Sequence, residues 1–295
     1  MNGSFVQMRT RPAFTAGFVA SCLAGILLGQ IVAVSPARAQ GSVSHIVVIM
    51  EENKKFARIV GNDCCPFING TMIANGVLAT DDHAIVSGSV HDYFALTDGL
   101  TTAQDGLADN VFHQLQQAGI SWRSYEETMP SSCYREKSYG TAPNLYVKGH
   151  DPAMFYRNIR RVPAACSNVV PLEGNLGADV SGGSLPAFSF IAPNECNDMH
   201  SCSAADGDRW LQTWVPKIAA ALGPDGVILL TWDEAEVGSL HIPLVEYGPG
   251  VTAAGLAGTT YDAPMNHYGE LAAIEDNWGL PRLNNARGAN ALPIP

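Results

Sequence analysis

Basic residues are scarce in this sequence. Its 295 residues include 17 lysines and arginines against 28 aspartates and glutamates, a formal net charge of −11. This balance excludes a basic nucleic-acid binder, because an acidic surface repels a phosphate backbone unless metal ions intervene. Charged residues make up only 15% of the chain and hydrophobic residues 46%. That composition excludes a disordered tail and a coiled coil, and it leaves a globular protein with a large core.

Long uncharged apolar runs are absent beyond the first 40 residues. The one such run covers residues 13–34, after Arg9 and Arg11 and before Ala37-Arg38-Ala39. Basic residues, an apolar run and small residues in this order are typical of a signal peptide with its cleavage site. The alternative is a transmembrane anchor, since the run is long enough to span a bilayer.

We therefore expect residues 1–39 to be a signal peptide and residues 40–295 to form a single domain. Internal repeats and low-complexity linkers, which would indicate further domains, are absent from the sequence. The exported chain would be secreted or periplasmic, with no stable membrane span after cleavage. It would keep 14 basic and 28 acidic residues, a net charge of −14.

Cys-x-x-Cys pairs are also absent, which argues against a zinc cluster. The predicted mature chain has an even number of cysteines, which in an exported protein indicates disulfides. Among the 15 possible connectivities we favour the local pairs Cys133 with Cys166 and Cys196 with Cys202. The remaining two cysteines are Cys64 and Cys65.

The apolar patterns that are present indicate an α/β protein. Short β-branched runs predict strands, and apolar residues at helical spacing predict helices between them. Their alternation predicts a mostly parallel central sheet flanked by helices. The strand candidates are residues 45–50, 185–191, 226–232 and 242–247, and the helix candidates are residues 108–118 and 208–222. Residues 126–183, rich in Gly, Pro, Ser and Cys, are expected to form an irregular, disulfide-braced insertion.

Acidic residues follow two of the predicted strands directly. The first strand runs into Glu51-Glu52-Asn53, and the strand that ends at Trp232 runs into Asp233-Glu234. In open α/β sheets functional groups collect at the carboxyl ends of strands, and carboxylate and amide oxygens suit a divalent cation. Either pair alone is more simply a solvated loop or the start of a helix. Two pairs at equivalent positions favour a metal site.

Three further positions are candidates for chemistry. Asp198 and His200 are two residues apart, which suits ligation of one ion or a carboxylate that orients an imidazole; the simpler interpretation is a polar loop. His267 precedes a predicted helix from Glu270 toward Trp278, where a cap or surface role is the alternative. Ser89 precedes an apolar segment that looks helical, so its hydroxyl is either a nucleophile near helix amides or a plain N-cap.

Taken together in order, these segments resemble the phosphoesterase family of secreted acid phosphatases and phospholipases C, a branch of the alkaline phosphatase superfamily. The segments that carry the resemblance span nearly the whole predicted mature chain. They are residues 45–53, Asn197-Asp198-Met199-His200, Thr231-Trp232-Asp233-Glu234, residues 241–245 with Gly248-Pro249-Gly250, and Asn266-His267-Tyr268 with residues 274–280.

The resemblance implies an alkaline-phosphatase-like sandwich with a metal site and a hydroxyl nucleophile. The metal ligands would correspond to Glu52, Asn53, Asp233 and Glu234, and Asp198 and His267 complete the set that we predict. The metal would be calcium, magnesium or manganese for an oxygen-rich site, or zinc if histidines take part.

By position, Ser89 is the nucleophile that the resemblance implies. Many relatives carry His-Pro-Ser-x-Pro-Asn-Tyr there, and this chain has Ser87-Gly88-Ser89-Val90-His91-Asp92-Tyr93. The serine and tyrosine are kept, and Asp92 brings a negative charge to a place where an amide is usual. By similarity His200 and His150 would contact the phosphate or protonate the leaving group.

The sequence thus predicts an exported, metal-dependent phosphoric ester hydrolase that forms a phosphoserine. The first hypothesis is an acid phosphatase acting on small phosphate monoesters. The second is a phospholipase C-type phosphodiesterase acting on a phospholipid headgroup, which the lack of an obvious amphipathic lipid-binding helix disfavours slightly. The third is a secreted binding protein that keeps the fold without turnover. Nucleic acid is not an expected partner.

Overall fold

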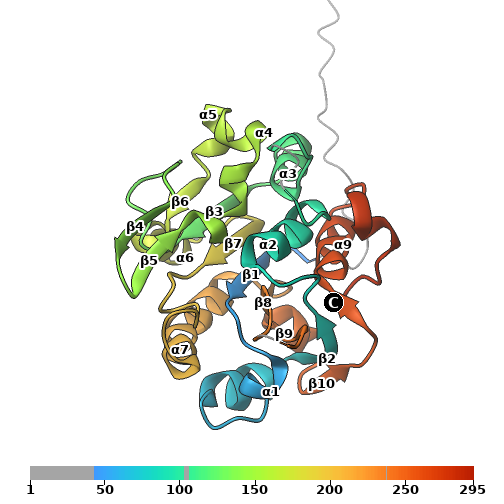
Figure 1. The fold of residues 1–295 in the computed structure, drawn as a ribbon. Coiled ribbons are helices and arrows are strands. Elements are labelled where there is room, and N and C mark those ends of the chain that lie inside the picture. The colour runs from blue at the N-terminus through green and yellow to red at the C-terminus, as the bar shows by residue number, and fades with distance from the viewer. Residues whose placement is uncertain (1–42, 103–105, 237) are drawn as a thin grey trace, which may run out of the picture. The chain divides into compact units, whose positions relative to one another are not determined.

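Runs of aliphatic and β-branched residues form the central strands of one large sheet (Figure 1). The computed structural model describes residues 43–102, 106–236 and 238–295, so the predicted signal peptide lies outside the described residues. In the described part the sheet has nine strands, with β11 (Met265–Asn266) paired to β2 beside the main path. That path runs β10 (Thr259–Tyr261), β2 (Val77–His83), β9 (His241–Tyr247), β8 (Val227–Trp232), β1 (Ile46–Glu51), β7 (Phe188–Ala192), β3 (Trp122–Glu126), β6 (Val169–Pro171).

The centre of the sheet is parallel and fully buried. β1 lies between β8 and β7 and runs parallel to both, with Ile46 opposite Val227 on one side and Phe188 on the other. Every residue of β1 and of β8 is buried. The prediction of buried parallel strands is therefore confirmed. β9 runs antiparallel to both β8 and β2, so the sheet is mixed but mostly parallel.

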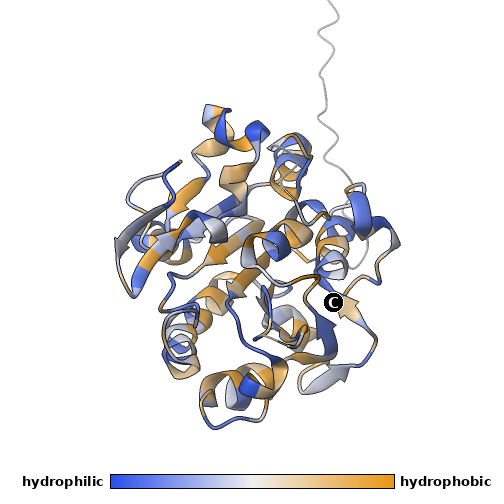
Figure 2. Ribbon diagram, viewed as in Figure 1, coloured by the Kyte–Doolittle hydropathy of each residue, from blue (hydrophilic) through white to orange (hydrophobic). Residues whose placement is uncertain are grey.

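Helices cover both faces of the sheet, and successive residues of β1 alternate between two hydrophobic clusters. Figure 2 shows the central strands mostly in orange, the colour of hydrophobic residues. Ile46, Val48 and Met50 pack with α2 (Ser89–Asp98), α3 (Val111–Ala118), η4 (Pro152–Phe155), α4 (Arg157–Arg160), α5 (Pro163–Cys166), α8 (Pro249–Ala253), α9 (His267–Asn277) and η5 (Asn284–Gly288). Val47 and Ile49 pack with α1 (Phe56–Ile59), η1 (Ile68–Ile73), α6 (Leu172–Gly182) and α7 (Ala204–Ala221). None of the helices in the described ranges has the length and apolar character needed to cross a bilayer.

Residues 126–183 are more regular than the sequence predicts. They contain β6, which joins the main sheet, the antiparallel hairpin of β4 (Ser138–Thr141) and β5 (Asn144–Val147), and η3 (Lys148–His150). These elements are only three or four residues long, too short to leave a periodic pattern. The expectation of an irregular insertion is therefore wrong in part.

Disulfides join both cysteine pairs that the sequence favours. Cys133 is bonded to Cys166, with 5.2 Å between their Cα atoms, and Cys196 to Cys202, with 4.6 Å. The adjacent Cys64 and Cys65 form a third disulfide in the described part of the chain.

Eight of the nine strands, all but β9, have their carboxyl ends at the same edge of the sheet. β1, β7 and β8 are parallel, and β2 joins them because it is antiparallel to β9, which is itself antiparallel to β8. β11 is parallel to β2 and leads directly into α9. The chain segments that follow these strands therefore meet at one place, as expected for the site of an open α/β sheet.

Candidate active site and metal centre

Strand alternation separates Glu52 from its neighbour Glu51. Met50 faces the α2 side of the sheet, so Glu51 faces the α7 side and Glu52, one residue past the strand, returns to the α2 side. The Glu52 amide donates to the backbone carbonyl of Asp198 (2.7 Å), which fixes the chain there. Burial first, and the charge of Asp198 second, raise the pKa of Glu52 to about 8.

Ser89 is the first residue of α2 and lies against two carboxylates. Its Oγ is 2.9 Å from Glu52 Oε2 and 3.4 Å from Glu234 Oε1. The second carboxylate is held in turn by the Gly88 amide, which donates to Glu234 Oε2 (2.8 Å). A hydroxyl has one proton, so Ser89 donates to one carboxylate at a time and has an acceptor for that proton in either case.

Asp233 lies next to Glu52 because Glu51 is in register with Trp232. Its Oδ1 accepts the amide proton of Asn53 (3.1 Å), and its buried Oδ2 has no hydrogen-bond partner within the described structure. Burial and the neighbouring Glu52 raise the pKa of Asp233 well above its ordinary value. Crowded carboxylates with an unpartnered buried oxygen are the donor set that a hard divalent cation satisfies, so these residues fit a metal ion.

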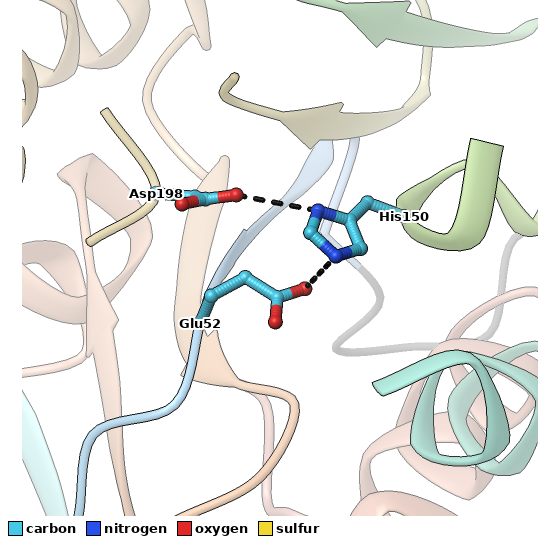
Figure 3. A group of neighbouring side chains, drawn as sticks. All are labelled: Glu52, His150 and Asp198. Carbon is cyan, nitrogen blue, oxygen red and sulfur yellow. Dashed lines mark ion pairs between the residues drawn. The ribbon is translucent and has the colours of Figure 1, made fainter. Parts of the chain in front are cut away.

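The other carboxylate oxygen of Glu52, Oε1, has contacts of its own (Figure 3). His150, from η3, places Nε2 3.1 Å from Glu52 Oε1 and Nδ1 3.3 Å from Asp198 Oδ2. Tyr93 donates its hydroxyl to the same Glu52 oxygen (2.7 Å), and its ring stacks on that of His150. Ligand atoms of Glu52, His150 and Asp198 lie within 4.8 Å of one another, a spacing that suits a metal ion.

His200 lies at the rim of this site. Its side chain is exposed, its ring centre is 6.0 Å from that of His150, and its Nδ1 is 3.1 Å from Ser201 Oγ. Asp198 Oδ1 accepts the His200 amide proton (2.7 Å), so the two residues are linked through the backbone.

His267 lies behind Asp233 and does not join the carboxylates around Ser89. Its Nε2 is 2.7 Å from the Asp233 carbonyl oxygen, and its Nδ1 is 2.9 Å from Glu270 Oε1. Burial opposes its charge, but Glu270, Asp92 and Asp82 raise the pKa of His267 to about 10. Both ring nitrogens are thus occupied by protein groups, and the geometry fits a role in positioning Asp233 better than the predicted metal ligation.

The Asp92 carboxylate, which stands where the resemblance implies an amide, contacts two backbone amides and His267. Its Oδ1 accepts protons from the amides of Ile85 (2.6 Å) and Val86 (3.3 Å) and lies 3.8 Å from His267 Nε2. The carboxylate therefore ties down the loop that leads into α2, and its charge faces a cation.

The structure brings together Glu52, Asn53, Ser89, His150, Asp198, Asp233 and Glu234, with His200 at the rim and His267 behind them. Sequence reasoning missed Tyr93 as a site residue. The signal was present: Ser89 and Tyr93 are four apart on a helix, so both side chains face Glu52.

Comparison with known proteins identifies the family of this chain. The sequence profile of the Phosphoesterase family matches residues 79–281. The chain is 31% identical to the phosphatidylinositol-3-phosphatase of Mycobacterium tuberculosis, over 98% of this chain and 97% of that protein. It is 30% identical to a probable acid phosphatase of Kluyveromyces lactis, over 69% and 50% of the two chains. It is 29% identical to an acid phosphatase of Aspergillus fumigatus, over 76% and 53%. The chain thus spans about half the length of these two fungal relatives.

Solved structures show the same fold at low sequence identity. An alkaline phosphatase superfamily protein from Vibrio parahaemolyticus matches 86% of this chain and 72% of its own, with a TM-score of 0.56 and 13% identity. The lipoteichoic acid synthase LtaP of Listeria monocytogenes matches 85% and 77%, with a TM-score of 0.59 and 8% identity. The predicted alkaline-phosphatase-like fold is confirmed. The chain belongs to the phosphoesterase family and is a phosphoric ester hydrolase.

Proposed function

We propose that this chain is a metal-dependent phosphomonoesterase that works through a phosphoserine at Ser89. The observation that carries the proposal is the position of the Ser89 hydroxyl, 2.9 Å from Glu52 and 3.4 Å from Glu234 at the start of α2. A nucleophilic serine needs a base within reach and a favourable place for the phosphate. The two carboxylates supply the base, and the amino-terminal end of α2 supplies the place for the phosphate.

The metal ligands that we propose are Glu52, Asn53, Asp198, Asp233 and Glu234, with calcium, magnesium, manganese or zinc as the cation. In that site a divalent cation would offset the carboxylate charges and polarise the phosphate ester. His150 lies between Glu52 and Asp198 and positions both. His267 does the same for Asp233 from behind.

The chain's own residues then account for two displacements. Ser89 passes its proton to Glu52 as its oxygen bonds to phosphorus, and the bond from phosphorus to the alcohol oxygen breaks. We assign the proton for the departing alcohol to His200, because its exposed ring at the rim is open to a leaving group. Water then attacks phosphorus and passes its proton to His200, the bond to Ser89 breaks, and Ser89 takes back the proton that Glu52 holds. The amino-terminal end of α2 favours the phosphate charge in both steps.

Phosphate monoesters are the substrate class that we propose. The relative that matches over 97% of its length is named a phosphatidylinositol-3-phosphatase, and the two fungal relatives are named a probable acid phosphatase and an acid phosphatase. These names support a monoester over a phospholipase C-type diester, and family membership supports an enzyme over a binding protein without turnover.

Export of the chain is part of the proposal. Three disulfides within the described residues fit an oxidising compartment. The amino-terminal sequence pattern supports the same conclusion, with residues 1–39 as a signal peptide and residues 40–295 as the mature domain.

The proposal is tested with purified protein and two matched serine variants. Ser89→Ala should lower turnover of p-nitrophenyl phosphate by several orders of magnitude, because the covalent route loses its first step. Ser87→Ala, two residues earlier, should retain most of the activity. Assays of the wild type against a monoester, a diester and phosphatidylcholine, each with and without chelator, decide the substrate class. Wild-type turnover in Ser89→Ala, or faster diester than monoester hydrolysis, would contradict the proposal.

A further inference from the structure

The few basic residues of this chain are concentrated in one segment. Residues 40–295 contain 14 lysines and arginines, and six of these lie between residues 135 and 161. We call this group the basic surface. Its members are Arg135, Lys137, Lys148, Arg157, Arg160 and Arg161.

Contacts hold these cations close together in space. Arg135 donates from Nη2 to the Arg160 carbonyl (2.6 Å), and the Lys148 amide donates to the Lys137 carbonyl (2.9 Å). Burial lowers the pKa of Arg160, and the neighbouring charges of Arg161, Arg157 and Arg135 lower it further. Like charges at short range destabilise the folded state, so a purely structural role does not explain this grouping.

Acidic side chains do little to balance the basic surface. Within the part of the chain that the structure describes, none of its six cations has a carboxylate oxygen within 4 Å of its charged nitrogens. The two acids in the same stretch are Glu136 and Asp151. Asp151 is buried and accepts the hydroxyl proton of Tyr146 (2.9 Å) and the Met154 amide proton. Arg135, Lys137 and Arg161 are exposed and the other three cations are half-buried, so the basic surface carries a net positive charge on an otherwise acidic protein.

Exposed hydrophobic side chains border the same surface. Among the described residues the large hydrophobics with the most exposure are Leu107 (70%), Tyr139 (49%), Val162 (45%) and Leu240 (40%). Val162 follows Arg161 directly, and Tyr139 contacts the ring of Tyr134, the residue before Arg135. Leu107 follows Gly106, where an added Cβ would lie 3.3 Å from Arg157 Cγ. Three of these four side chains thus accompany the cations.

The basic surface is linked to the candidate active site through η3. His150, at the end of this short helix, reaches Glu52. Lys148, at its start, places Nζ 4.9 Å from the ring centre of Phe155, the last residue of η4, and Tyr156 alone separates η4 from α4. A partner bound to the basic surface would therefore lie beside the site that holds Ser89.

We propose that the basic surface docks the protein onto an anionic lipid membrane. Clustered Lys and Arg are attracted to anionic lipid headgroups, and exposed aliphatic and aromatic side chains insert into the membrane interface. An anionic membrane offers both the negative charge and the apolar interior that this surface matches. A nucleic acid or another soluble polyanion would use the charges and leave Leu107, Tyr139 and Val162 in water. The proposal concerns the partner of this surface and does not depend on the phosphoserine mechanism.

Co-sedimentation with lipid vesicles tests the proposal. Wild-type protein should bind vesicles of phosphatidylcholine with 30% phosphatidylserine and should not bind pure phosphatidylcholine. Lys137→Glu/Arg161→Glu reverses two exposed cations and should weaken binding to the anionic vesicles at least about tenfold. The matched control, Lys217→Glu/Arg287→Glu, makes the same change in net charge on α7 and η5 and should bind nearly as wild type does. Val162→Ser should weaken binding as well, with little change in its salt dependence.

Folding is checked separately by thermal melting, and by turnover of p-nitrophenyl phosphate where the wild type shows it. Equal loss of binding in the two charge-reversal variants would overturn the proposal, because net charge alone would then explain binding. Equal binding to both kinds of vesicle would also overturn it. Inorganic polyphosphate that binds as tightly as the anionic vesicles, without an effect of Val162→Ser, would assign the surface to a soluble polyanion instead.

Discussion

Glu52 is the residue on which the candidate site converges. One carboxylate oxygen faces Ser89, and the other accepts the Tyr93 hydroxyl and lies beside His150. The sequence predicts its place, because Glu52 and Asp233 each follow a buried strand and parallel strands end at one edge. The contact with His150 could not be predicted from residue physics, since this histidine comes from a three-residue helix in a segment without periodicity. Only the family resemblance pointed to it.

Glu246 provides a prediction about pH and stability. This side chain of β9 is buried, and neither carboxylate oxygen has a hydrogen-bond partner in the described structure. Burial raises the pKa of Glu246 from 4.5 to about 8. Between these two values the folded protein holds a proton that the unfolded chain has released, so the free energy of unfolding falls as the pH rises through this window.

Glu246→Gln removes this titration. Above pH 8 we expect the variant to be more stable than the wild type by on the order of 2–4 kcal/mol, and below pH 4.5 the two should be similar. Urea unfolding at several pH values measures the difference, with the exposed Asp63→Asn as a control that should follow the wild type. The same fall in stability between pH 5 and pH 8 in Glu246→Gln and wild type would contradict the assignment.

At the scale of elements, apolar runs identified the central strands and four of the longer helices, α2, α3, α7 and α9. The predicted strands 45–50, 185–191, 226–232 and 242–247 correspond to β1, β7, β8 and β9, and the helix predicted from Glu270 begins at His267 as α9. β2 was missed because Thr80, Asp81 and Asp82 interrupt its apolar pattern. That omission matters, since β2 is the strand that delivers Ser89 to the edge where Glu52 and Asp233 lie.

The loop after β7 gives a prediction at this scale. It carries Asp198 and is closed by the disulfide between Cys196 and Cys202. Gly207 of α7 packs against the loop, and a Cβ there would lie 2.5 Å from Met199 Cγ and 2.8 Å from the Asn197 carbonyl oxygen. Gly207→Ala should therefore displace Asp198, lower kcat roughly tenfold and cost about 1–3 kcal/mol of stability.

Gly177→Ala is the matched control for this substitution. Gly177 lies in α6, where an added Cβ would meet only Trp214 at 3.9 Å, an ordinary contact. Alanine should leave turnover unchanged there and stabilise the helix slightly. Steady-state kinetics and urea unfolding measure both effects. If the two alanines lower turnover alike, or neither does, the loop does not depend on Gly207 for its position.

At the scale of the whole molecule, charge is distributed unevenly. Carboxylates crowd the edge of the sheet that carries the candidate site, and nearly half of the basic residues of positions 40–295 form the basic surface. Composition alone indicates the acidic excess, but it says nothing of where the cations lie. The short elements of residues 135–161 determine that, and they leave no pattern in the sequence.

Removal of a bound cation should affect the entire fold. Without it, Glu52, Asp233 and Glu234 repel one another at the end of two central strands, so chelation should lower both the melting temperature and the activity. Differential scanning calorimetry with and without EDTA measures the shift, and addition of calcium, magnesium, manganese or zinc in turn should show which ion restores it. An unchanged melting temperature together with unchanged activity would contradict a metal site at this position.

The nucleophile assignment is tested most directly by trapping the covalent intermediate. Wild-type protein is mixed with a ³²P-labelled phosphate monoester, quenched rapidly in acid, digested and mapped by mass spectrometry. The account predicts a labelled phosphoserine at Ser89, and none in the Ser89→Ala variant. Label on Ser87 or on a histidine would contradict it, and so would equal labelling of the Ser89→Ala variant.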